Sequence, residues 1–233
     1  MELTDLLMSF LTLSALEIVL GIDNLIFIAL VADGVQPEYR RKVRLLGLSL
    51  ALIIRVAMLL GLSWIMQLTE PLLTVAEQEI SARDLLLLGG GLFLLWKSTV
   101  EMHADIGGVE EKRAMVAAQS LQGAILQIGI IDLVFSFDSI ITAVGIGSNL
   151  YIMISAIMVS MVVMLVASEG ISHFLRTYPT FKMLALSFIL MIGVVLIAEG
   201  LHMHIPKGYI YFAFAFSLGV EFLNILASKK RKK

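Results

Sequence analysis

The chain has 233 residues and a formal net charge of −2; 59% of its residues are hydrophobic and only 15% are charged. Soluble globular domains usually carry about 25% charged residues, so the composition excludes an ordinary water-soluble domain. The absence of cysteine excludes disulfide bonds, thiolate metal sites and thiol redox chemistry within the chain. The apolar residues form long continuous blocks without alternation, which favours membrane-spanning helices over a β-barrel. We therefore predict an all-α membrane protein.

Short polar or Gly- and Pro-containing segments divide the apolar sequence into seven predicted transmembrane helices. These helices cover residues 6–32, 45–67, 84–100, 120–146, 150–170, 184–200 and 208–227. The break between the fourth and fifth is short, which predicts a tight helical hairpin. The N-terminus carries Glu2 and Asp5 instead of a basic segment, so we expect the first block to remain as a helix rather than act as a cleaved signal peptide. We predict that residues 1–233 form a single transmembrane domain.

The distribution of Lys and Arg predicts the orientation. Most of them lie in one set of alternate loops, including residues 40–44, and in the tail 229–233. The opposite side has only Arg83 and Lys207, and Arg55 lies inside a predicted helix. The positive-inside rule then places the N-terminus outside and the C-terminus in the cytoplasm. The basic tail is interpreted as a topology anchor, with binding to anionic lipid as an alternative.

Two acidic motifs repeat along the chain. Residues 17–24 read EIVLGIDN and residues 132–139 read DLVFSFDS, so each has an acid, five residues, an Asp and a small polar residue. The third and sixth helices also correspond, through Gly89–Gly91 and Gly193. Two repeats of three helices each must be inverted relative to one another, which is the usual plan of secondary transporters. The predicted parts are repeat one at about 1–110, repeat two at about 111–205 and an extra helix at about 208–227.

Inverted helices place particular acids at the same membrane depth. Glu17 is expected to lie level with Asp138, and Asp23 level with Asp132. The two levels would be about 9 Å apart if both helices were unbroken. Gly21 lies within the first motif, where the helix could open. We predict a local distortion near Gly21 that turns the Asp side chains toward a shared centre and frees backbone carbonyls as ligands.

The acids inside the predicted helices need charge compensation. One charged side chain at the bilayer centre costs at least about 2.5–3.5 kcal/mol. Arg55 is the only basic residue deep inside a predicted helix, and we interpret it as a counter-ion, with snorkelling toward the interface as the alternative. It cannot neutralise every acid, so either several are protonated or a cation passes through. Carboxylate, amide and hydroxyl oxygens are hard ligands that suit Mn²⁺, Mg²⁺ or Ca²⁺.

Several features allow two interpretations. Glu169, Glu199 and Glu221 could be protonated core groups or interfacial residues, and Asn224 could extend the polar centre. The His residues at 202 and 204 could bind metal ions at the outer end of the predicted transport path, or they could be ordinary interfacial residues. The 13 Met residues could suggest Cu(I), but they are scattered and are interpreted as packing residues. The glycine run 89–91 lies inside an apolar helix, so it is interpreted as a site of close helix packing rather than a phosphate-binding loop.

Residues 16–24 and 132–139 resemble the two signatures of the TerC family of bacterial membrane proteins, and the resemblance extends from about residue 5 to 226. Residues 78–84 and 206–212 are similar to the short inner-membrane branch that lacks the cytosolic domains of longer relatives. The resemblance implies a multi-pass protein of the bacterial inner membrane, with seven spans and a relationship to LysE-type exporters. It also implies Mn²⁺ export, with the motif residues as metal ligands. The implied ligands are Glu17, Asp23, Asn24, Asp132, Asp138 and Ser139.

The leading functional hypothesis is a secondary exporter of a divalent cation, with Mn²⁺ first and Ca²⁺ or Mg²⁺ as alternatives. No nucleotide-binding motif is present, so membrane potential or proton exchange would drive transport. The expected partners are the cation and the lipid bilayer; no organic cofactor and no nucleic acid are expected. The alternative is a membrane scaffold or assembly factor that metallates or escorts exported proteins. The predicted helices contain no nucleophile–base pair and no metalloprotease spacing, so we do not expect an enzyme.

Overall fold

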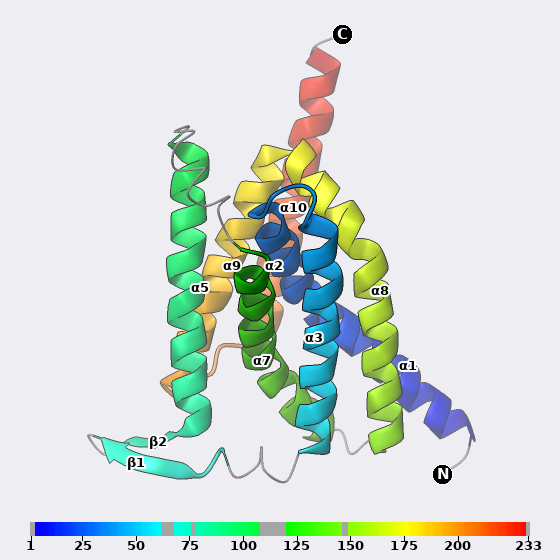
Figure 1. Ribbon diagram of the computed structural model, residues 1–233, viewed down its shortest axis with the longest axis vertical. Coiled ribbons are helices and arrows are strands. Elements are labelled where there is room, and N and C mark those ends of the chain that lie inside the picture. The colour runs from blue at the N-terminus through cyan, green and yellow to red at the C-terminus, as the bar shows by residue number, and fades with distance from the viewer. Residues whose placement is uncertain (1–2, 62–67, 76–77, 108–119, 146–148, 232–233) are drawn as a thin grey trace. The chain divides into compact units, whose positions relative to one another are not determined.

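The computed structural model describes residues 3–61, 68–75, 78–107, 120–145 and 149–231, and most of them are helical (Figure 1). The elements are α1 (Leu3–Leu20), α2 (Ile22–Asp33), α3 (Arg40–Leu60), β1 (Pro71–Val75), β2 (Gln78–Ser81), α5 (Ala82–Ile106), α7 (Leu121–Gly145), α8 (Leu150–Thr177), α9 (Pro179–Gly200) and α10 (Lys207–Arg231). Each of the predicted apolar stretches overlaps a helix, and the first overlaps the pair α1 and α2. The all-helical membrane class is therefore confirmed.

The described residues contain five to six candidate membrane spans. Helices α3, α5, α8, α9 and α10 are each long and apolar enough to cross a bilayer. Helices α1 and α2 meet this requirement only as one span, which is bent by 42°. In α7 the described apolar part, Leu121–Phe137, is shorter than a full span. The count of seven spans stays a prediction.

The chain divides into two compact units. The first unit contains Met1–Arg83 and Glu110–Ser172, and the second contains Asp84–Val109 and His173–Lys233. The first unit therefore combines α1, α2, α3, α7 and most of α8. The second combines α5, α9, α10 and the end of α8. Each unit takes helices from both halves of the sequence.

The core of the first unit lies where α3 packs on α7. A Cβ added to Gly47 would lie 2.6 Å from Ile128 Cδ1, and one added to Gly129 would lie 2.7 Å from Leu50 Cδ2. Small residues let two helices approach closely where lipid gives no hydrophobic drive for association. Helix α2 is buried without interruption from Asp23 to Ala32. This burial fixes the helix that carries Asp23 and Asn24 of the first acidic motif.

In the second unit, α5 and α9 meet backbone to backbone at two glycines. A Cβ on Gly91 would lie 2.6 Å from the carbonyl oxygen of Gly193, and a Cβ on Gly193 would lie 3.0 Å from the carbonyl oxygen of Gly91. The interpretation of the glycine run as a packing site is therefore confirmed at Gly91, whereas a Cβ on Gly89 would meet nothing within 4 Å. Helix α10 packs on α9 through the stacked rings of Phe188 and Phe214, whose centroids are 4.0 Å apart.

A β-hairpin between α3 and α5 was not predicted. Strands β1 and β2 pair antiparallel from Pro71 opposite Ser81 to Val75 opposite Gln78, with an irregularity between Pro71 and Leu73. The segment had been interpreted only as polar punctuation between helices. Strands of four and five residues are too short to produce a clear alternating pattern.

Candidate metal site

The first acidic motif contains a break in the helix. Helix α1 ends at Leu20, Gly21 has φ −91° and ψ 1°, and α2 begins at Ile22. The Gly21 N–H donates to Glu17 O at 3.0 Å, and Leu25 N–H donates to Gly21 O at 2.9 Å. The predicted distortion at Gly21 is confirmed. The carbonyls of Glu17 and Gly21 still accept hydrogen bonds within the chain, so the break does not free them as ligands.

The centre of the site is a buried ion-pair cluster around Arg55 of α3. Its Nη1 donates to Glu17 Oε2 at 2.9 Å, and its Nη2 donates to Asp132 Oδ1 at 2.9 Å. Arg55 Nε also donates to Asp132 Oδ1, at 3.2 Å. All three side chains are buried. The interpretation of Arg55 as a counter-ion is therefore confirmed.

Asp132 also accepts hydrogen bonds from two neutral side chains. Asn24 Nδ2 donates to Asp132 Oδ1 at 3.2 Å, and Ser136 Oγ donates to Asp132 Oδ2 at 3.1 Å. Both carboxylate oxygens are thus satisfied from α2, α3 and α7. Buried charges are tolerated only when they are paired and hydrogen-bonded in this way.

The two acids Glu17 and Asp132 were predicted to lie at different membrane levels, about 9 Å apart if both helices were unbroken. They nevertheless share one guanidinium group. That estimate assumed unbroken helices, whereas the chain bends at Gly21. The long side chain of Arg55 also reaches both carboxylates from a third helix, which the comparison of two helices did not include.

The other predicted ligands lie in or beside the same two helices. Asp23 is buried, and its Oδ1 accepts the backbone N–H of Asn24 at 3.0 Å. Ser139 Oγ donates to the carbonyl oxygen of Ser136 in its own helix at 3.1 Å. Asp138 belongs to α7, but its side chain is outside the described part of the structure. Side-chain contacts, direct or through Arg55, therefore join Glu17, Asn24 and Asp132, and Asp23 contacts the backbone of Asn24.

Among the described side chains, no three carboxylate or imidazole groups form a cluster that could hold a metal ion as they stand. The guanidinium group occupies the position between two of the acids. Arg55 and Ser136 were not in the predicted ligand set. Two features of the sequence pointed to them. Arg55 is the only base near the middle of a predicted helix, and Ser136 occupies the place of Gly21 in the second motif.

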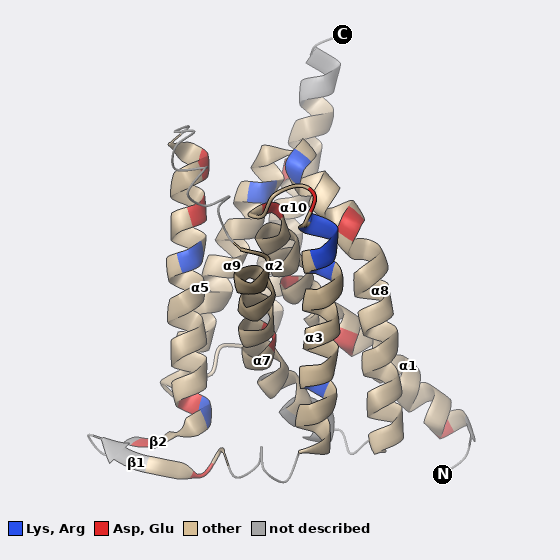
Figure 2. Ribbon diagram, viewed as in Figure 1, with Lys and Arg blue, Asp and Glu red and all other residues tan. Residues whose placement is uncertain are grey.

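The first unit has a second polar cluster where α2 ends, α3 begins and α8 approaches its end (Figure 2). Ser172 Oγ, which is fully buried, donates to Asp33 Oδ1 at 2.9 Å. Arg44 lies 3.9 Å from Glu169, whose side chain is 77% exposed. Glu169 therefore lies on the surface of the protein and is not a core group.

The second unit contains the remaining acids that the sequence had singled out. Glu199 is buried, which supports the core interpretation for that residue. His202 Nε2 lies 3.1 Å from Oδ2 of the buried Asp84, so this histidine joins the end of α9 to the start of α5. His204 is exposed, and Glu221 is half-buried.

The sequence model of the integral membrane protein TerC family matches residues 2–233. The chain belongs to the TerC family. It is 49% identical over 219 residues to the UPF0053 inner membrane protein YgdQ of Escherichia coli K12, covering 94% of this chain and 92% of that protein. A UPF0053 protein of Haemophilus influenzae is 51% identical over 218 residues, covering 93% and 92%.

A longer relative shares the same region. The UPF0053 inner membrane protein YoaE of Escherichia coli K12 is 48% identical over 220 residues, which are 94% of this chain but 42% of that protein. No solved structure matches the chain. These similarities and the apolar helices identify this TerC family member as a multi-pass protein of the bacterial inner membrane.

Proposed function

We propose that the protein is a secondary transporter that exports a divalent metal cation, with Mn²⁺ as its substrate. The observation that carries this proposal is the buried cluster of Glu17, Arg55 and Asp132 beside a helix break. Buried ionisable groups within membrane helices are costly and usually belong to ion or proton pathways. Broken helices whose polar groups meet inside the protein are typical of secondary transporter sites.

The proposed topology has seven spans, an outside N-terminus and two inverted repeats of three helices, followed by α10. The division into units supports this plan, because α1, α2 and α3 group with α7 and α8, while α5 groups with α9. The reciprocal contact of Gly91 and Gly193 agrees with it, since equivalent residues of two inverted repeats meet where a pseudo-twofold axis passes between them.

The proposed ligands are Glu17, Asp23, Asn24, Asp132, Asp138 and Ser139. Their carboxylate, amide and hydroxyl oxygens suit Mn²⁺, and also Ca²⁺ and Mg²⁺. The choice of Mn²⁺ comes from the resemblance to family members that are taken to export it.

Arg55 has a defined role in this mechanism. Its guanidinium compensates Glu17 and Asp132 between transport cycles, because two bare carboxylates within the bilayer would be unstable. A cation that binds these oxygens must displace the guanidinium. The guanidinium of Arg55 and the transported cation therefore alternate as partners of Glu17 and Asp132. The two carboxylates have a positive charge beside them throughout the cycle.

The test uses purified full-length protein in liposomes, with Mn²⁺ entry reported by a trapped fluorescent chelator. We expect flux with the wild type and a loss of at least tenfold in Asp23→Ala and Asp132→Asn. Glu38→Gln is the matched control, because Glu38 is an exposed loop acid. Wild-type flux in both site variants would refute the proposal. Absence of flux in the wild type, together with stable protein partners in pulldowns, would favour the scaffold or assembly factor.

A further inference from the structure

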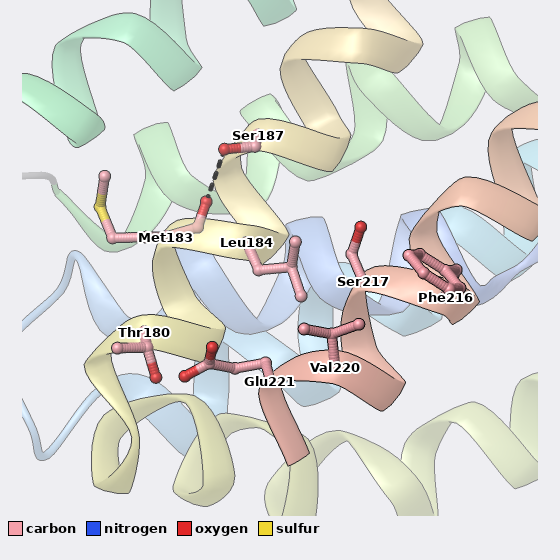
Figure 3. Close-up of a pocket in the computed structure, with 8 residues that line it drawn as sticks. All are labelled: Thr180, Met183, Leu184, Ser187, Phe216, Ser217, Val220 and Glu221. Carbon is pink, nitrogen blue, oxygen red and sulfur yellow. Dashed lines mark hydrogen bonds between the residues drawn. The ribbon is translucent and has the colours of Figure 1, made fainter. Parts of the chain in front are cut away.

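The second unit contains a groove between α9 and α10 with a volume of about 380 Å³ (Figure 3). Both walls belong to apolar helices that are long enough to span a membrane, Pro179–Gly200 and Gly208–Ala227. The groove lies near the start of α9 and toward the end of α10. None of the residues in the Arg55 cluster lines it, so it is separate from the proposed transport site.

The acidic group of the groove is Glu221. Its carboxylate points toward Thr180 at the first turn of α9 (Figure 3). Its hydrogen bond comes from Asn224 Nδ2, at 3.3 Å. Within the described part of the chain, no ion pair joins Glu221 to a Lys, Arg or His. A carboxylate inside an apolar span without a basic partner is compensated either by a proton or by a cation from elsewhere.

The serine hydroxyls of the groove act as acceptors toward any ligand. Ser187 Oγ donates its proton to the carbonyl oxygen of Met183 at 2.9 Å, and Ser217 Oγ donates to that of Ala213 at 2.8 Å. Their oxygen lone pairs remain available. Together with the carboxylate of Glu221, they favour a ligand group that donates hydrogen bonds and carries positive charge. A phosphate group alone would meet acceptors and a negative charge.

Apolar side chains continue the groove beyond Glu221. Leu184 of α9 and Val220 of α10 lie between the acidic end and the serines (Figure 3). Phe216 is 65% exposed and forms an outer wall. Because the outer surface of a spanning helix faces lipid, an acyl chain can enter this part of the groove from the side.

We propose that this groove binds an aminophospholipid, with its primary ammonium group on Glu221 and an acyl chain along Leu184, Val220 and Phe216. The charge of the ammonium group complements the carboxylate of Glu221, whose oxygens accept its N–H groups.

The binding test uses the purified full-length chain in detergent, incubated with equimolar phosphatidylethanolamine and phosphatidylglycerol and examined by native mass spectrometry. We expect the amine lipid to be retained about tenfold over the anionic lipid, since one charge-assisted hydrogen bond accounts for a difference of this size. Glu221→Gln should abolish the preference. Glu169→Gln, which removes an exposed carboxylate elsewhere, should keep it. Equal retention of both lipids, or an unchanged preference in Glu221→Gln, would overturn the proposal.

Two further measurements address the shape of the groove. Val220→Trp fills it without changing charge, and we expect it to release the amine lipid while the protein remains monodisperse. Because the chain has no native cysteine, Ser217→Cys gives a single thiol. Disulfide formation between two copies through that thiol would assign the groove to a second copy of the chain and would overturn lipid binding. Retention of the lipid by a folded Val220→Trp variant would also overturn the proposal that the lipid binds in this groove.

Discussion

Glu17 and Asp132 belong to different helices, yet each accepts a hydrogen bond of 2.9 Å from the same guanidinium group. Arg55 therefore links the first acidic motif to the second through a third helix. The link explains how two carboxylates can be buried in an apolar interior. It also makes Arg55 the residue on which both the stability and the chemistry of the site depend.

The first prediction concerns the loss of this positive charge. Arg55→Leu leaves two buried carboxylates without their partner, and we expect it to destabilise the protein by about 3–5 kcal/mol. Thermal unfolding in detergent, followed by circular dichroism, measures the effect. Lys42→Leu removes an exposed base from the same helix and should change stability by less than about 0.5 kcal/mol. Equal stability of the two variants would contradict a structural role for the ion pairs.

The second prediction concerns the helix break. A Cβ at Gly21 would lie 2.9 Å from Glu17 O and 2.8 Å from Met164 Sδ. Gly21→Ala should therefore destabilise the protein by about 1–3 kcal/mol and reduce the proposed Mn²⁺ flux. Gly219→Ala is the matched control, because nothing lies within 4 Å of its added Cβ. If Gly21→Ala unfolds at the same temperature as Gly219→Ala, the close packing around the break is not significant.

The third prediction compares two glycines in α5 that are separated by one residue. A Cβ at Gly91 would meet the backbone of Gly193 at 2.6 Å, whereas a Cβ at Gly89 would meet nothing within 4 Å. Backbone atoms of a packed helix cannot move aside as a flexible side chain can. We expect Gly91→Ala to cost about 1–3 kcal/mol, while Gly89→Ala should be neutral or slightly stabilising. Identical unfolding temperatures for the two variants would rule out the α5–α9 contact.

The fourth prediction concerns the polar contact between α2 and α8. Ser172 is fully buried and donates to Asp33, so Ser172→Ala should cost about 1–3 kcal/mol. Ser155 lies on the same helix, is exposed and donates only to a carbonyl of its own helix. Ser155→Ala should therefore have little effect in the same unfolding measurement. A larger loss from Ser155→Ala than from Ser172→Ala would show that this contact does not hold α8 in place.

The sequence predicted the helices well because each apolar block is long and continuous. It also predicted the distortion at Gly21 and the pairing of Arg55, since one glycine interrupts an acidic motif and one base lies among many acids. In both cases the identity and position of a single residue predicted the structural feature.

Other features depend on tertiary geometry that a linear pattern does not contain. The meeting of Glu17 and Asp132 depends on a bend of 42° and on the reach of a side chain from α3. The hairpin of β1 and β2 depends on cross-strand pairing between very short segments. Neither the bend angle nor the pairing register can be derived from apolar periodicity.

The arrangement around Arg55 also has a consequence for the order of biosynthesis. Glu17 and Arg55 are translated long before Asp132, so these two can neutralise one another as soon as the first helices enter the bilayer. Asp132 then arrives in α7 and joins a guanidinium group that is already in place. Asp132 therefore enters the bilayer when its partner Arg55 is already there. The first unit reaches its final form only after α7 has been inserted.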